Sequence, residues 1–79
     1  MTIKEKIYEI TARRMKRDIS ELDDNTSLKK DLNADSIDVV EIIFEIEEEY
    51  NIDIDDKYAE QINTLSDAVR VVEDIISGG

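Results

Sequence analysis

The sequence predicts an all-α protein, a small four-helix bundle with three longer helices, a short third helix and a long loop between the first two. Three stretches repeat apolar residues every three or four positions, and none keeps the two-residue alternation of a strand. Each predicted helix also follows a residue that can cap it. At 79 residues, the chain is expected to form a single domain over residues 1–79.

The first helix is expected over residues 2–17. Thr2 and Glu5 have the spacing of a capping box, in which two side chains satisfy the first free N–H groups. The apolar face contains three isoleucines at helical spacing: Ile3, Ile7 and Ile10. Arg14 falls on the same face and interrupts it, and we expect the basic side chains of this helix to be solvated.

Residues 18–35 lack helical periodicity and are expected to form a loop with at most one short turn. A loop of this length is compact only when it packs through its own side chains. Four apolar side chains of this loop are expected to insert separately into the core rather than to form a helix face: Ile19, Leu22, Leu28 and Leu32.

The second helix is expected over residues 36–50, with Asp35 available as its cap. At about 100° per residue, one apolar arc is assigned to the core: Val39, Ile42, Ile43, Ile46 and Tyr50. A second arc lies more than a quarter-turn away and is flanked by Glu41, Glu47 and Glu48. This second arc contains Ile37, Val40 and Phe44. It indicates a docking surface for a partner with an apolar centre and a basic rim, unless this helix is more deeply buried than a bundle requires.

Asp55 or Asp56 is expected to cap a short third helix that runs through Ile62. Thr64 and Asp67 have capping-box spacing and predict the start of a fourth helix. The apolar stripe of the fourth helix contains Leu65, Ala68, Val69, Val72, Ile75 and Ile76. The loop before the third helix is expected to turn two side chains inward: Ile52 and Ile54.

The composition narrows the possible functions. The chain has no Cys, His, Trp or Pro, and therefore no disulfide, Cys/His zinc site, thiol nucleophile or imidazole base. We expect a protein that is not an enzyme and has no metal site. No apolar run is long enough to span a bilayer, and no signal peptide is recognisable, which predicts a cytoplasmic monomer without membrane insertion.

The chain is strongly acidic, and its charge is unevenly distributed along the sequence. The net charge is −11, yet residues 1–17 carry six basic and two acidic side chains. Residues 18–79 carry only four basic side chains against nineteen acidic ones. This balance disfavours nucleic acid and favours basic protein partners, although acidity that serves only solubility is an equal alternative on composition alone.

A serine, Ser36, opens the second helix, and its hydroxyl is free for another role if Asp35 supplies the cap. Around this serine the chain resembles the acyl carrier proteins. The motif of that family is Asp-Ser-Leu, commonly preceded by Gly-Ala, and residues 33–38 read Asn-Ala-Asp-Ser-Ile-Asp. Residues 47–50 and 59–64 also resemble later segments of the family, so the likeness covers essentially the whole chain.

The resemblance implies that a 4'-phosphopantetheine arm is transferred from coenzyme A by a phosphopantetheinyl transferase and joined to Ser36 by a phosphodiester. The thiol of the arm would hold the growing acyl chain as a thioester and present it to enzymes of fatty-acid biosynthesis. The resemblance also implies that basic residues of those enzymes meet the acids Asp35, Asp38, Glu41, Glu47 and Glu48, followed by Asp56 and Glu60. It implies that the apolar contacts are made by Ile37, Val40 and Phe44.

The sequence departs from the family pattern at Asn33, Ile37, Glu45 and Asp55, which leaves partner specificity open. A stand-alone carrier for a polyketide, aminoacyl or other specialised pathway is the first alternative. A second is an acidic interaction module in which Ser36 is only a cap. A third is a divalent-cation module, because residues 31, 33 and 35 have the spacing of the first ligands in an EF-hand loop. The sixth position of such a loop should be glycine and the twelfth glutamate, but here they are Ser36 and Ile42.

Overall fold

The computed structural model describes residues 1–78. Its helices are α1 (Ile3–Met15), α2 (Ser36–Tyr50), α3 (Asp56–Ala59) and α4 (Leu65–Ile76), with a 3₁₀ turn, η1 (Ile19–Glu21), after α1. These residues contain no strand, and only Ser27 and Thr64 form an isolated β-bridge. The predicted all-α fold, with three longer helices and a short third one, is confirmed.

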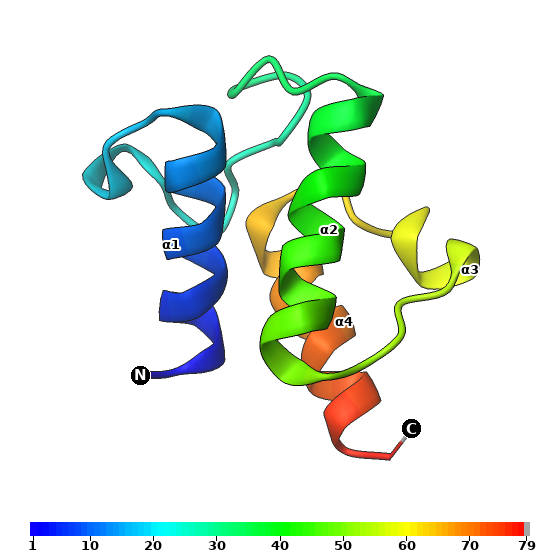
Figure 1. Ribbon diagram of the computed structural model, residues 1–79. Coiled ribbons are helices and arrows are strands. Elements are labelled where there is room, and N and C mark those ends of the chain that lie inside the picture. Colours follow the sequence, from blue (N-terminus) through cyan, green and yellow to red (C-terminus); the bar gives the residue numbers. More distant parts are fainter. Residues whose placement is uncertain (79) are drawn as a thin grey trace.

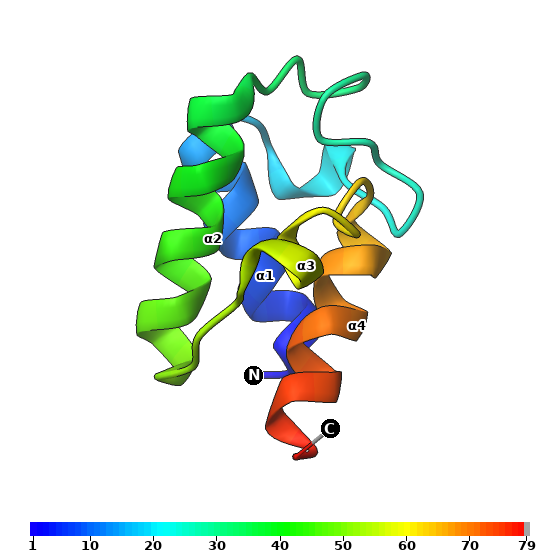
Figure 2. The ribbon, with the colours of Figure 1, turned by 90° about the vertical axis from the view of Figure 1, so that its right-hand side faces the viewer.

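The helices are arranged around a shared core. α1 and α2 lie side by side and run in opposite directions, and α4 packs against α1 (Figure 1). α3 lies between α2 and α4, on the side of the bundle away from α1 (Figures 1 and 2). Residues 16–35 cross the end of the bundle where α2 begins (Figure 1). This arrangement leaves one face of α2 without a helix packed against it.

The predicted caps begin the helices. Capping boxes are formed by Thr2 with Glu5, by Asp35 with Asp38, and by Thr64 with Asp67. Asp55, one of the two residues expected to do so, caps α3. α3 ends at Ala59, before the predicted end at Ile62, because Gln61 and Ile62 donate to carbonyls three residues back in a tighter turn. α1 ends two residues before the predicted boundary, because the backbone of Lys16 turns into the left-handed region at φ 56° and stops the helix.

The core combines residues of α1, α2 and α4, and α3 packs against it through the partly buried Tyr58 and Ala59. The most deeply buried side chains include Ile7, Ile10, Ile46, Leu65 and Val72. The predicted core arc of α2 is confirmed: Ile42 and Ile46 are buried, and Val39, Ile43 and Tyr50 pack against the core. Ile54 is buried as predicted, and Ile52 packs partly buried beside it.

Two apolar predictions are wrong. Ile19 is 48% exposed, because it begins the 3₁₀ turn η1 on the surface while Leu22 enters the core. On α4, Val71 is buried and Ile76 is 49% exposed, the reverse of the predicted stripe. The last turn of α4 extends past the start of α1, where no helix covers it (Figures 1 and 2).

The long loop is ordered by its own contacts. Leu22, Leu28 and Leu32 are buried, as predicted. The Leu28 N–H donates to Asn63 O at 3.0 Å, and the Leu65 N–H donates to Thr26 O at 3.1 Å. The loop is therefore fastened to the start of α4, and it holds the segment before α2 in a defined position.

Candidate functional site

Ser36 is the first residue of α2, and its hydroxyl takes no part in capping that helix. The Asp35 carboxylate accepts the Asp38 N–H at 2.9 Å, and the Asp38 carboxylate accepts the Asp35 N–H at 3.2 Å. The prediction that Asp35 supplies the cap is confirmed. The side chain of Ser36 is exposed, and its hydroxyl makes no hydrogen bond with any residue from 1 to 78.

The backbone before Ser36 is held from inside the protein. Leu32 and Ala34 are both buried, and the Ala34 N–H donates to Leu28 O at 2.9 Å. Between them Asn33 adopts the left-handed conformation at φ 57°, which asparagine tolerates better than most residues. This turn reverses the chain and directs residue 36 to the surface.

A shallow apolar groove lies beside Ser36, between α2 and α3. Its volume is about 300 Å³, and it is lined by Lys29, Ser36, Val39, Val40, Ile43, Asp56, Ala59 and Glu60. A second hollow of about 310 Å³ shares Lys29 and Val39 with it and continues toward Ile62. An exposed hydroxyl therefore stands at the edge of an apolar surface that can cover part of a flexible chain.

The second apolar arc of α2 is exposed. Ile37 is 64% exposed, Val40 52% and Phe44 59%. The alternative that α2 is buried on all sides is therefore wrong. We call these three residues the apolar strip. A shallow hollow beside Phe44 is rimmed by Glu41, Glu45 and Glu48.

The prediction that the basic side chains of α1 are solvated is wrong for Lys6 and Arg14, which are partly buried, whereas Arg13 is 62% exposed as predicted. All three form ion pairs. Lys6 pairs with Glu49 at 3.6 Å, and Arg13 pairs with Glu45 at 3.2 Å. Arg14 pairs with both Asp38 and Glu41. The nearby Glu49 and Glu9 carboxylates raise the pKa of Lys6. The reason is geometric: α1 and α2 are antiparallel neighbours, so the basic edge of one meets the acidic edge of the other.

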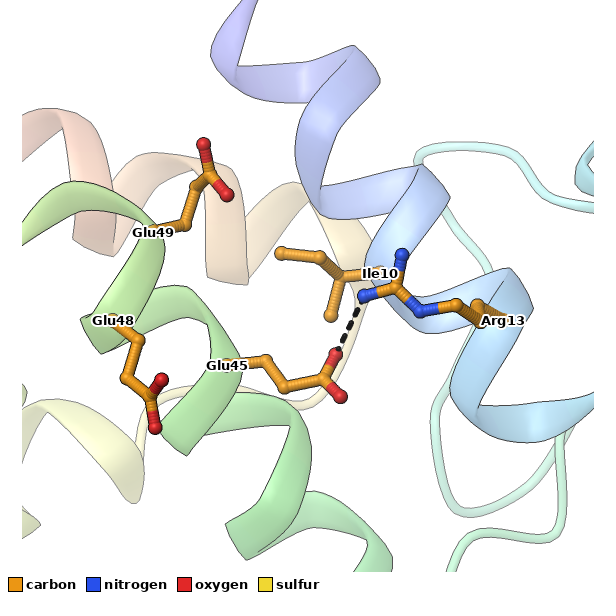
Figure 3. A pocket seen from close by; sticks show the side chains of 5 residues that line it. All are labelled: Ile10, Arg13, Glu45, Glu48 and Glu49. Carbon is orange, nitrogen blue, oxygen red and sulfur yellow. Dashed lines mark hydrogen bonds and ion pairs between the residues drawn. The ribbon is translucent and has the colours of Figure 1, made fainter.

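Figure 3 shows part of this contact. The Arg13 guanidinium reaches from α1 toward Glu45 of α2, and Glu48 and Glu49 lie on the same helix (Figure 3). The hollow that these side chains enclose with Ile10 has a volume of about 330 Å³. It contains an ion pair and is bordered by carboxylates, so it is unsuited to an apolar chain.

The remaining predicted acids fall into two groups. The Glu47 carboxylate accepts the Ile54 N–H at 2.7 Å and so holds the loop that follows α2. Glu48, Asp56 and Glu60 are exposed and form no ion pair within residues 1–78. No three acidic side chains in this part of the chain are grouped closely enough to hold a metal ion.

Several residues near the site were not predicted to contribute to it, including Val39 and Ile43, which were assigned only to the core. Lys29 and Ala59 line the groove beside Ser36, from the long loop and from α3. Their sequence signals were weak, because an exposed lysine and a single alanine are common anywhere. Arg14 had a clearer signal, since a basic residue that interrupts an apolar face often meets an acid on a neighbouring helix.

The fold and the site together are those of a carrier protein. A family model described as "Phosphopantetheine attachment site" matches residues 5–72, and the chain belongs to the acyl carrier protein family. It is 47% identical over 70 residues to an acyl carrier protein of Rubrobacter xylanophilus, covering 89% of this chain and 86% of that one. The solved structure of a candidate acyl carrier protein from Mycobacterium tuberculosis matches with a TM-score of 0.86 at 29% identity, over 92% of this chain and 97% of the other.

Membership of this family confirms the predicted class and cofactor. Acyl carrier proteins are carriers rather than enzymes, and they bear a covalently attached 4'-phosphopantetheine. They bind acyl chains and interact with phosphopantetheinyl transferases and with synthesis enzymes. None of the helices in residues 1–78 combines the length and apolar character needed to cross a membrane.

Proposed function

We propose that Ser36 bears the phosphopantetheine arm and that this single domain carries a growing acyl chain for fatty-acid biosynthesis. The observation that carries the proposal is the exposed Ser36 hydroxyl, which is relieved of capping by Asp35 and stands beside the apolar groove. A nucleophilic hydroxyl in this position is open to a transferase. When bound, the arm supplies a terminal thiol that holds the acyl group as a thioester.

The start of α2 suits the phosphodiester of the arm. The N–H groups of Ser36 and Ile37 lie in the first helical turn and have no acceptor within the helix. These N–H groups and the positive end of the helix dipole favour an anion. Asp35 and Asp38 oppose it through like charge. Asp38 is paired with Arg14, whereas Asp35 forms no ion pair within residues 1–78 and is expected to attract basic residues of the transferase.

The groove between α2 and α3 supports a role in covering the acyl chain. Val39, Val40, Ile43 and Ala59 give it apolar walls next to Ser36. An acyl chain that returns from the arm to this groove would remove apolar surface from water, which is favourable by about 25 cal/mol per Å² buried.

Partner enzymes are proposed to dock on the apolar strip. Its exposed side chains form a contiguous apolar surface on α2, and exposed apolar surface with an acidic border favours a basic partner. The predicted contact residues remain Asp35, Ile37, Asp38, Val40, Glu41, Phe44, Glu47, Glu48, Asp56 and Glu60. A location in the cytoplasm remains part of the proposal.

Fatty-acid synthesis is favoured over a specialised pathway by the acidic α2 and by the Ala-Asp-Ser form of residues 34–36. To test this, the purified chain is incubated with coenzyme A and a phosphopantetheinyl transferase, and its mass is then measured by mass spectrometry. The wild type should gain one phosphopantetheinyl group, and Ser36→Ala should gain none. Ser66→Ala, which removes another exposed serine hydroxyl, is the matched control and should be modified normally.

The pathway is tested on the modified protein. A malonyl transferase and a ketosynthase of fatty-acid synthesis should load and elongate it. Failure of both reactions, together with loading by an aminoacyl-activating enzyme, would assign the chain to a specialised pathway. Modification of Ser36→Ala would refute the choice of residue.

A further inference from the structure

The acids around the apolar strip are not equally available to a partner. On the side of α2 that faces α1, Asp38 and Glu41 pair with Arg14, Glu45 pairs with Arg13, and the more distant Glu49 pairs with Lys6. Each of these carboxylates already has a cation beside it, so this edge of α2 attracts a partner's base less than its composition indicates.

Among these cations, Arg14 reaches two carboxylates of α2, whereas Lys6 and Arg13 each reach one carboxylate of α2 and Glu9 of their own helix. The Arg14 side chain is 31% exposed, compared with 62% for Arg13 and 26% for Lys6. Its Nε is buried without a hydrogen-bond partner within residues 1–78. A side chain that is packed along its length loses less freedom on pairing than a solvated one, which makes the pair more persistent.

The acids on the opposite edge of the strip are in a different state. Asp56 and Glu60 border the groove with Val40, on the side of the strip that faces α3. Both are exposed, and within the part of the chain that the structure describes neither forms an ion pair. Their charge is therefore available to an incoming protein.

We propose that Arg14 masks Asp38 and Glu41 within the same chain and thereby sets the orientation in which partners dock. The inferred partner is a protein with an apolar centre that covers the apolar strip and basic residues that reach toward α3, onto Asp56 and Glu60. A base arriving at Glu41 would only replace Arg14, exchanging one ion pair for another. A base arriving at Glu60 forms an ion pair where none exists. This inference rests on the proposed function, because it concerns the partners of the same surface.

The test compares neutral substitutions on the two edges of the strip. The KM of a phosphopantetheinyl transferase for the unmodified chain is measured at low salt, where exposed charges count most. Glu60→Gln should raise KM about two- to fivefold, the range expected for one exposed ion pair, and Glu41→Gln should change it by less than about 1.5-fold. Arg14→Gln should lower KM about two- to fivefold, because it uncovers two carboxylates.

The combined variant gives the sharpest result. In the Arg14→Gln chain, Glu41→Gln should raise KM about as much as Glu60→Gln does in the wild type. Arg70→Gln is the matched control, because its ion pair with Asp67 lies on α4, and it should leave KM unchanged. An equal rise in KM for Glu41→Gln and Glu60→Gln in the wild-type background, with no effect of Arg14→Gln, would overturn the inference.

A second measurement is independent of any modification at Ser36. Binding of an amphipathic helical peptide of leucine and arginine is measured by calorimetry for the same variants. Weaker binding to Glu60→Gln and tighter binding to Arg14→Gln support the masking by Arg14, even if the wild-type chain is never modified. Unchanged binding to both variants counts against the masking, even if Ser36 is modified as proposed. The masking by Arg14 and the modification of Ser36 can therefore each be refuted without refuting the other.

Discussion

The phenol of Tyr8 donates a hydrogen bond to the carboxylate of Asp24, sixteen residues further along the chain. Tyr8 is buried on α1, and Asp24 also pairs with Lys4 at 3.2 Å. Burial, together with the Asp24 carboxylate, raises the pKa of Tyr8, and hydrogen bonds from Tyr8 and Lys4 lower the pKa of Asp24. The long loop that leads to Ser36 is thus fastened to α1 by a side-chain contact as well as by its leucines.

Removing this contact should loosen the fold measurably. Tyr8→Phe keeps the buried ring and removes only the hydroxyl, so we expect the free energy of unfolding in urea to fall by about 1 kcal/mol. Tyr58→Phe is the control, since the Tyr58 hydroxyl makes no hydrogen bond within residues 1–78. Equal losses in the two variants would show that the Asp24 contact does not stabilise the protein.

Capping and charge can be separated at Asp35. Asp35→Ala removes the oxygen that accepts the Asp38 N–H and should lower the free energy of unfolding by about 1 kcal/mol. Asp35→Asn keeps a capping oxygen and should cost only a few tenths of a kcal/mol. Thermal unfolding followed by circular dichroism measures both. The prediction fails if the asparagine variant is as unstable as the alanine variant.

The apolar strip should contribute to partners and not to stability. Phe44→Ser should change the free energy of unfolding by no more than about 0.5 kcal/mol, as at other surface positions, while lowering kcat/KM for the transferase. Ile46→Ala, at a position 1% exposed, should cost about 2–5 kcal/mol. A comparable loss in Phe44→Ser would mean that the strip belongs to the core.

The net charge of −11 should make the fold sensitive to cations. Repulsion among the acids opposes the compact state, so millimolar magnesium should raise the melting temperature at neutral pH and low salt. An equal ionic strength of sodium chloride separates general screening from a specific effect of the divalent ion. No rise with either salt would contradict the expected repulsion.

Acid should first stabilise and then destabilise the protein. Lowering the pH from 7 toward about 5 reduces the repulsion and should raise the melting temperature. The Thr64 and Asn63 N–H groups hold the pKa of Asp67 below its ordinary value, so its contribution is present above the pKa of the unfolded chain and disappears as the pH falls through the lowered one. Asp67→Asn should therefore show a smaller loss of stability at the acid end, measured by calorimetry across pH.

The parts of the fold that depend on local sequence were predictable. A capping box involves residues three positions apart, so the starts of α1, α2 and α4 follow from short patterns. The two arcs of α2 were also predictable, because helical periodicity alone separates Ile46 from Phe44. The same periodicity placed Ser36 at a helix start, next to a residue able to replace it as the cap.

The errors share a different cause. The predicted stripe of α4 included Ile76 and left out Val71, because the apolar residues of this helix cover so wide an arc that periodicity does not define its centre. The packing of α4 against α1 decides which of them is buried. Ile19 is apolar in sequence but lies on a surface turn. The pairing of Arg14 with Glu41 depends on which helices are neighbours and on their relative height, which no local pattern contains.

The sequence by itself determined the all-α class, the helix starts, the exposed strip of α2 and the position of Ser36, because capping and helical periodicity are properties of neighbouring residues. Tertiary structure alone decided which acids are already paired, which side chains line the groove beside Ser36, and how the loop is fastened. Those features depend on distances between segments far apart in the chain. An ion pair such as Arg14 with Glu41 forms only once packing has brought two helices side by side.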